Sequence, residues 1–249
     1  MSGHSKWATI KHKKGKLDAQ RGQAFTKLIR EITVAARSGG GDASMNPRLR
    51  TAVAAARAAN MPADNIKKAI QKGTGELPGV SYDEITYEAY GPGGVAILIE
   101  VVTDNRNRAV AELRHLLSRH GGNMGEAGCV NWMFTKQGFI QVDGKGVDED
   151  SLMMAALDAG ATDVVRFGAV YDIYTEPASL ENVRAVVEKS GMAINSAEMA
   201  MIPKSTVKLD EKQATQMIKL REALEGHDDV QKVHDNSDIE DELMEKLAG

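Results

Sequence analysis

Five lysines lie among the first sixteen residues of the chain, and Trp7 directly follows the first of them. A segment with so few apolar side chains cannot build a core, so we expect an extended basic arm over residues 1–15. Lysine ammonium groups neutralise phosphates and release counterions, which makes polyanion binding strongly dependent on salt. The indole of Trp7 is suited to stacking on a nucleic-acid base; the alternative is that it anchors the arm on the domain that follows.

The basic character continues beyond the arm. Residues 1–75 hold 15 Lys and Arg against 4 Asp and Glu, whereas the remaining residues hold 16 basic and 31 acidic side chains. This split predicts that the first part meets a polyanion while the acidic part keeps the molecule soluble. The alternative is a solvated basic surface without a partner. The candidate nucleic-acid-binding residues are Lys6, Trp7, Lys11, His12, Lys13, Lys14, Lys16, Arg21, Lys27, Arg30, Arg48, Arg50, Arg57, Lys67, Lys68, Arg106 and Arg108.

Hydrophobic spacing predicts three helices in the basic part. The first carries Phe25, Ile32 and Ala36 on one face, with Lys27, Arg30, Val34 and Arg37 on the other. The second starts at Asn46-Pro47, a capping residue followed by proline in the first turn. The third follows Asn60-Met61-Pro62, has Lys67, Lys68 and Lys72 outward, and ends at Gly73. We therefore expect a basic arm and a three-helix domain over residues 1–75.

Beyond a glycine-rich linker the pattern changes to alternating strands and helices. A hairpin is predicted at 85–90 and 95–103, then a helix with Val110, Leu113 and Leu117 inward, and a strand at 129–135. Residues 138–203 show the β-α-β-β-α-β order of a ferredoxin-like unit. Its predicted strands are 139–142, 163–167, 170–175 and 192–201, and its predicted helices are 149–159 and 180–190.

The tail supplies one more helix, 210–225, and one more strand, 230–234. Residues 80–135 lack such a pair, so we expect the tail to fold back on them. The predicted fold is multidomain α+β, with an N-terminal three-helix domain followed by two ferredoxin-like α+β domains, the second inserted in the first. The discontinuous domain comprises 80–135 plus 205–249, and the inserted domain comprises 138–203.

One cationic cluster stands out in the acidic part, at Thr103 to Arg108. Asp104 is suited to capping the helix that starts here. Arg106 and Arg108 oppose the helix dipole at this end, which suggests another role. The sequence leaves two alternatives open for them: an anion or nucleic-acid contact, or a salt bridge between domains.

Catalytic and metal-binding signatures are not found. The chain has no GxxxxGK, HExxH or GxSxG, and Ser205 and Lys208 form an SxxK without supporting motifs. His227, Asp228, Asp229 and His234 are the most obvious potential ligands, but we expect them to face solvent beside a strand. A single cysteine excludes an intramolecular disulfide, and the longest aliphatic run is far shorter than a membrane span. We expect a cytoplasmic non-enzyme without cofactor or metal, whose acidic domains offer a surface for a protein partner.

The motifs together resemble the YebC family, which includes the mitochondrial translational activator of cytochrome c oxidase. The resemblance covers essentially the whole chain and is carried by GHSKW at 3–7, FTKL at 25–28, REI at 30–32, NPRLR at 46–50, NMP at 60–62, DNI at 64–66, YGPGG at 90–94 and TDNRNR at 103–108. Ala43 and Ala89 depart from the pattern at places where proline and glycine are expected.

The resemblance implies a three-domain fold and a non-enzymatic role in gene expression. Bacterial members are described as DNA-binding transcriptional regulators, and other members as translation factors on ribosomes. Because the motifs begin at Met1, we expect a bacterial-type cytosolic member without a transit peptide. DNA and ribosomal RNA both remain open as the polyanion. A further alternative is a protein-interaction module that uses the acidic domains.

Overall fold

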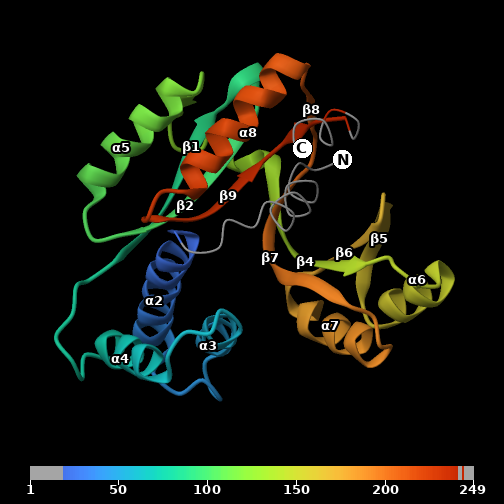
Figure 1. Cartoon of the computed structure of the whole chain (residues 1–249), viewed down its shortest axis with the longest axis horizontal. Helices are drawn as coiled ribbons and strands as arrows, with labels where there is room; N and C mark the ends of the chain where they lie inside the picture. The colour runs from blue at the N-terminus through green and yellow to red at the C-terminus, as the bar shows by residue number, and fades with distance from the viewer. Residues whose placement is uncertain (1–18, 241–242, 244–249) are drawn as a thin grey trace.

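The computed structural model describes residues 19–240 and 243, and its first unit is helical (Figure 1). It contains α2 (Ala19–Gly39), α3 (Pro47–Ala58) and α4 (Ala63–Thr74). The predicted start of α3 is confirmed, because the side chain of Asn46 accepts a hydrogen bond from the Leu49 amide. Ile32, Leu49 and Ile66 lie in the shared core.

One prediction for α2 is wrong. Val34, expected on the polar face, is buried. It shares that face with Arg30 and Arg37, which contact the chain between Ser81 and Val102 and the loop before β9. Both faces of α2 are therefore covered, and the helix joins two units.

The end of α4 also differs from the prediction. Gly73 lies inside the helix, and Gly75, with a left-handed φ of 83°, ends it. A Cβ on Gly73 would lie 2.4 Å from the Thr33 carbonyl oxygen and 2.7 Å from the Ala36 Cβ. Glycine at 73 therefore permits close contact between α4 and α2.

Gly73→Val is expected to lower the free energy of unfolding by about 1–3 kcal/mol, because the added methyl groups push α4 away from α2. Urea denaturation followed by circular dichroism measures the change. Gly22→Ala is the control, because a Cβ on Gly22 meets nothing within 4 Å. An unchanged unfolding midpoint for the Gly73 variant would contradict this account of the contact.

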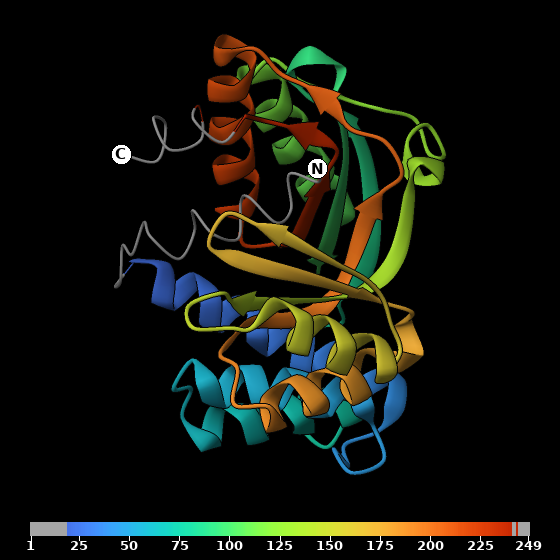
Figure 2. The ribbon, with the colours of Figure 1, turned by 90° about the vertical axis from the view of Figure 1, so that its right-hand side faces the viewer.

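The second unit is a four-stranded antiparallel sheet with two helices on one face (Figures 1 and 2). Its strand order is β3-β1-β2-β9, and the tail strand β9 pairs with β2. The core lies between the sheet and the helices α5 and α8 and includes Ile97, Leu113 and Leu220. The elements are β1 (Asp83–Tyr90), β2 (Ala96–Thr103), α5 (Arg106–Arg119), β3 (Asn123–Met124), α8 (Glu211–Glu225) and β9 (Val230–Asp235). A short parallel pair, β8 (Val207–Lys208) and β10 (Ser237–Asp238), lies beside this unit.

The third unit is inserted between β3 and α8 and has the strand order β5-β6-β4-β7. Antiparallel β6 separates the parallel strands β4 and β5, and β4 separates β6 and β7, which is the split βαβ arrangement. Its elements are β4 (Phe134–Asp143), α6 (Glu149–Asp158), β5 (Ala161–Phe167), β6 (Val170–Thr175), α7 (Leu180–Lys189) and β7 (Ile194–Pro203). The molecule is thus a multidomain α+β protein.

The segment before β4 corrects one predicted strand. Residues 129–133 do not form a strand; Asn131–Met133 is a 3₁₀ turn, and a single strand then runs from Phe134. The carboxylate of Glu88 holds this segment by accepting from the amides of Gly128, Val130 and Asn131. Among the described helices, none is long and apolar enough to cross a bilayer.

Candidate nucleic-acid interface

The predicted nucleic-acid-binding residues fall into three groups in the structure. The first group comprises Lys6, Trp7, Lys11, His12, Lys13, Lys14 and Lys16, which lie outside the described residues. Arg21 belongs to α2, and its side chain is likewise outside the description. For these residues the sequence-based prediction stands as made.

The second group consists of exposed cations on α3 and α4. Arg57, Lys67 and Lys68 are exposed and form no ion pair within residues 19–240. Arg50 is also exposed and donates to the carbonyl oxygens of Ala43 and Ser44, at 3.3 and 3.2 Å, so its charge has no carboxylate partner there either. Because Ile66 and Ala69 of α4 face the core, Lys67 and Lys68 project from the outer side of the helix. Within residues 19–240, α3 and α4 thus carry at least four exposed cations that no carboxylate neutralises.

The third group makes contacts inside the molecule. Lys27 donates to the carbonyl oxygen of Glu225 at 2.6 Å, and the neighbouring Gln23 donates to that of Gly226 at 2.9 Å. These oxygens lie at the C-terminal end of α8, where a positive charge is favourable. Lys27 therefore helps to fix the helical unit on the second unit.

Arg48 has a similar role on the other side of α2. Its guanidinium binds Glu31 of α2 at 2.7 Å and Glu84 of β1 at 2.6 Å. Hydrogen bonds to these two carboxylates raise the pKa of Arg48 above its usual range. The side chain links α3, α2 and β1.

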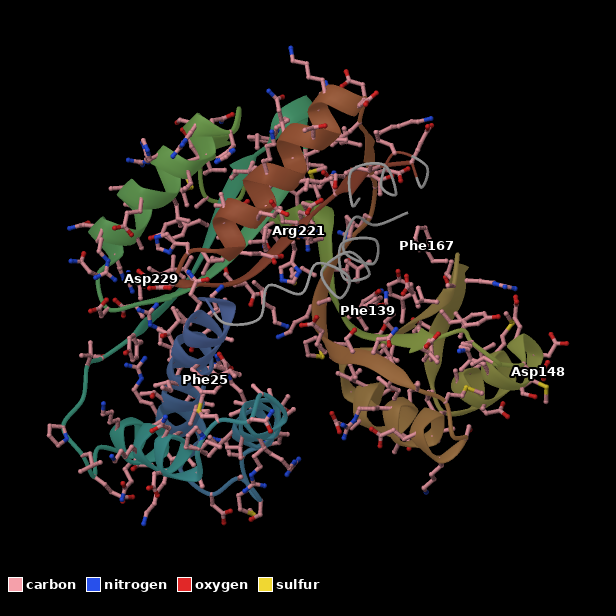
Figure 3. All side chains as sticks on the ribbon, in the orientation of Figure 1. Phe25, Phe139, Asp148, Phe167, Arg221 and Asp229 are labelled. Carbon is pink, nitrogen blue, oxygen red and sulfur yellow. The ribbon has the colours of Figure 1, made fainter. Side chains whose placement is uncertain are left out.

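Asp229 is the centre of the contact between the helical unit and the second unit (Figure 3). Its carboxylate binds Arg30 of α2 at 2.5 Å and Arg108 of α5 at 2.9 Å, and it accepts from the Thr103 hydroxyl at 2.7 Å. The Asp229 side chain is only 3% exposed. Burial pushes the pKa of its carboxyl upward, but the hydrogen bonds from Arg108 and Thr103 and the charge of Arg30 outweigh it, so the pKa is lowered. The carboxylate is therefore charged at neutral pH.

Both arginines of the cluster at 103–108 form salt bridges in the structure. Arg108 binds Asp104 at 2.7 Å in addition to Asp229, and exposed Arg106 binds Asp83 at 2.9 Å. Asp104 is not the helix cap that the sequence predicted. Asn105 has that role and accepts from the Arg108 amide. The nucleic-acid alternative for Arg106 and Arg108 remains a prediction.

The expectation that the histidines and aspartates near β9 face solvent is wrong for two of the four; Asp228 is exposed as expected and His227 is partly exposed. Asp229 and His234 are buried, because β7 covers this part of β9 and α2 covers the loop before it. His234 contacts Glu100 at 3.0 Å and accepts from the Met201 amide at 3.4 Å.

A potential metal-binding group lies beside these residues. Ligand atoms of Glu112, His227 and Asp229 lie within 4.8 Å of one another. However, His227 Nδ1 accepts from the Asp229 amide, and its Nε2 contacts Glu112 at 2.8 Å. Both oxygens of Asp229 are already bound by cationic arginines. A hydrogen-bond network accounts for these side chains without a metal ion.

Comparisons with known proteins identify the family. The TACO1/YebC N-terminal domain matches residues 5–76, and the TACO1/YebC second and third domain matches residues 82–237. The chain belongs to the TACO1/YebC family. The boundary between the two matches coincides with the segment that precedes β1.

Similar proteins cover the full chain. A probable transcriptional regulatory protein of Desulfotalea psychrophila is 57% identical over 249 residues, with full coverage of both chains. One of Geobacter sulfurreducens is 59% identical over 247 residues and covers 99% of this chain and all of its own. A conserved hypothetical protein from Aquifex aeolicus, known from a crystal structure, is 49% identical in sequence. Its structure matches with a TM-score of 0.82, and the match covers 91% of this chain and 93% of that chain.

Sequence reasoning missed the central role of Asp229. The residue follows another aspartate and precedes a strand of mixed polarity, a context shared by many solvated turns. Its partners, Arg30 and Arg108, lie 199 and 121 positions away along the chain. No local spacing signal points to such a contact.

Proposed function

We propose that this protein is a non-enzymatic, nucleic-acid-binding regulator of gene expression that acts on DNA in the cytoplasm. The observation that carries the proposal is that some of its cations are paired with carboxylates and others are not. Arg30, Arg48 and Arg108 are neutralised by carboxylates, whereas Arg57, Lys67 and Lys68 are exposed without a carboxylate partner among the described residues. The names of the similar proteins support a regulatory role.

The chemistry of the surface favours contacts with the phosphate backbone. Lysine is a flexible point charge that binds phosphates without fixed geometry. Asn, Gln and Arg are the residues that most often read base edges. Helix α4 contains no arginine and its Asn65 and Gln71 are half-buried, whereas Lys67 and Lys68 are exposed. We therefore expect binding to many sequences, with recognition of shape and backbone.

The double variant Lys67→Glu/Lys68→Glu tests the proposal. We expect about tenfold weaker binding to a duplex DNA, and a salt dependence whose log–log slope falls by about two, because two phosphate contacts are lost. Fluorescence anisotropy at several salt concentrations measures both quantities. Lys212→Glu/Lys219→Glu on α8 makes the same charge change on another unit and should leave both unchanged. Equal affinity and slope for the α4 variant and the unmodified protein would overturn the proposal for this surface.

Ribosomal RNA is the alternative target, because phosphate contacts do not distinguish it from DNA. Sedimentation of tagged protein from a lysate on sucrose gradients separates the two. Co-migration with ribosomal particles that is lost at high salt, or on deletion of residues 1–16, would favour a translation factor. Protein that stays at the top of the gradient at both salt concentrations would favour DNA and transcription.

A further inference from the structure

The inserted unit has one sheet face that carries no helix. Helices α6 and α7 pack on the face that contains Ile140 and Ile173. Because side chains alternate along a strand, the register places Phe139, Tyr174 and Glu198 on the opposite face. Figure 3 shows Phe139 and Phe167 on the side of the sheet away from α6 and α7. We call this side the helix-free face; its other polar residues include Gln137, Gln141, Asp143, Asp163, Asp172 and Ser196.

The helix-free face is acidic and aromatic. Asp143, Asp163, Asp172 and Glu198 contribute carboxylates, of which Glu198 is paired with Lys232 of β9. Strand alternation places Lys136 and Arg166 of the sheet itself on the other face. The rings of Phe139 and Tyr174 lie next to each other, with centroids 5.7 Å apart. Burial raises the pKa of the Tyr174 hydroxyl well above its usual range, and the negative charges of Asp172 and Asp163 add to the effect.

Two side chains show that this face is a contact surface and not a solvated one. Phe139 is 1% exposed and Asp172 is 2% exposed, although α6 and α7 lie on the other side of the sheet. Asp172 accepts from the Gln141 amide at 3.2 Å. Burial of a carboxylate is costly, so its environment must favour the negative charge.

The N-terminal segment has the complementary composition. Residues 1–18 contain Lys6, Lys11, Lys13, Lys14 and Lys16 together with Trp7, and only one acidic residue, Asp18. A partner of the helix-free face needs positive charges for its carboxylates and an aromatic ring for its own rings.

The segment also has the necessary reach. It ends at α2, whose Gln23 contacts the loop that leads into β9. Lys232 of β9 binds Glu198 at the edge of the helix-free face, at 2.5 Å. Eighteen residues span at most about 60 Å when extended, more than a small domain measures across.

We propose that the helix-free face of the inserted unit is the docking surface for the basic N-terminal segment of the same chain, residues 1–18. The complementary groups are the lysines and Trp7 of the segment on one side and the carboxylates and aromatic rings of the face on the other. The docked segment withholds these lysines from phosphates, so nucleic acid and the acidic face compete for them. The competition rests on the proposed function, whereas the docking does not.

Tryptophan fluorescence tests the docking. The chain contains two tryptophans, so Trp132→Phe leaves Trp7 as the only one. In this background we expect acrylamide to quench Trp7 weakly at low salt. Quenching should rise at least about twofold at high salt, because screening weakens the ion pairs. Asp163→Lys should raise the quenching of Trp7 in the same direction at low salt.

The control makes the same charge change on the helical side of the inserted unit. Asp150→Lys alters one exposed position of α6 and should leave Trp7 quenching low. Circular dichroism confirms that each variant is folded. Strong quenching of Trp7 at low salt, unchanged by the face variant, would overturn the docking proposal whether or not the protein binds nucleic acid.

Addition of duplex DNA separates the docking from the proposed function. If DNA releases Trp7 from the face, and the face variant binds DNA several-fold more tightly than the control, the competition is supported. If Trp7 is shielded but DNA neither binds nor changes its quenching, the docking stands and nucleic-acid binding by the segment is wrong.

Discussion

Asp229→Ala is expected to lower the free energy of unfolding by about 3 kcal/mol, because it removes a buried carboxylate from two arginines. The change leaves Arg30, whose side chain is 13% exposed, without its carboxylate, and it removes an acceptor from the buried Thr103 hydroxyl. Urea denaturation measures the loss. Hydrogen exchange in α2 should accelerate, because the helix is then held to the second unit by fewer contacts.

A matched control shows whether this loss of stability is specific to Asp229 or follows from removing any carboxylate. Asp83→Ala breaks the exposed pair with Arg106 and should change the unfolding free energy by less than about 1 kcal/mol. If both variants lose the same stability, Asp229 is not the centre of the contact.

The lowered pKa of Asp229 gives this contact a definite pH dependence. Its stabilisation is complete above the ordinary pKa of an aspartate, about 3.9, and is lost as the pH falls toward the lower pKa of the folded state. The difference in stability between the unmodified protein and Asp229→Asn should therefore shrink below about pH 4. A difference that stays constant down to pH 2 would contradict the charged carboxylate.

Lys13→Glu/Lys14→Glu/Lys16→Glu is expected to weaken nucleic-acid binding by about 100-fold at moderate salt, the largest functional effect that we predict. Three lost phosphate contacts should lower the salt slope by about three, since each contact contributes close to one. Anisotropy with several unrelated duplexes measures the change, which should be similar for all of them because phosphate contacts carry no sequence information.

Comparison with the α4 variant measures how much the arm and the helices each contribute to binding. A combined variant should show nearly additive losses if both regions touch phosphates independently. Unchanged affinity and slope in the arm variant alone would show that the N-terminal lysines do not bind the nucleic acid.

Local signals in the sequence predicted most elements. The capping residue Asn46, the proline after it and the apolar spacing around Ile66 located α3 and α4, and the β-α-β-β-α-β order located the inserted unit. Each of these signals depends on residues that are close together in the sequence. The end of α4 was misplaced because a glycine inside a helix and a glycine that ends one look alike in sequence. The structure distinguishes them by the Thr33 carbonyl and the Ala36 Cβ opposite Gly73 and by the left-handed φ of Gly75.

The contacts between units could not be predicted in this way. Lys27 and Arg30 are basic helix residues like Lys67 and Lys68, yet their surroundings differ. Lys27 binds the end of α8 and Arg30 binds the loop before β9, whereas Lys67 and Lys68 face solvent. The difference depends on which surface α2 meets after the tail has folded back. Charge counts correctly predicted a cationic domain. They could not distinguish the cations that hold the units together from the cations that stay exposed.

The pairing of β2 with β9 has a consequence for the order in which the protein is made. The partner of Ile97 is Asp235, so the second unit cannot complete its sheet until almost the whole chain has been synthesised. The helical unit and the inserted unit contain all their own elements and can form earlier. During this interval β2 has an open edge, which is prone to pair with strands of other chains. The loop with Asp229 emerges just before β9, so the nascent helical unit acquires its fixed position only at the last stage of synthesis.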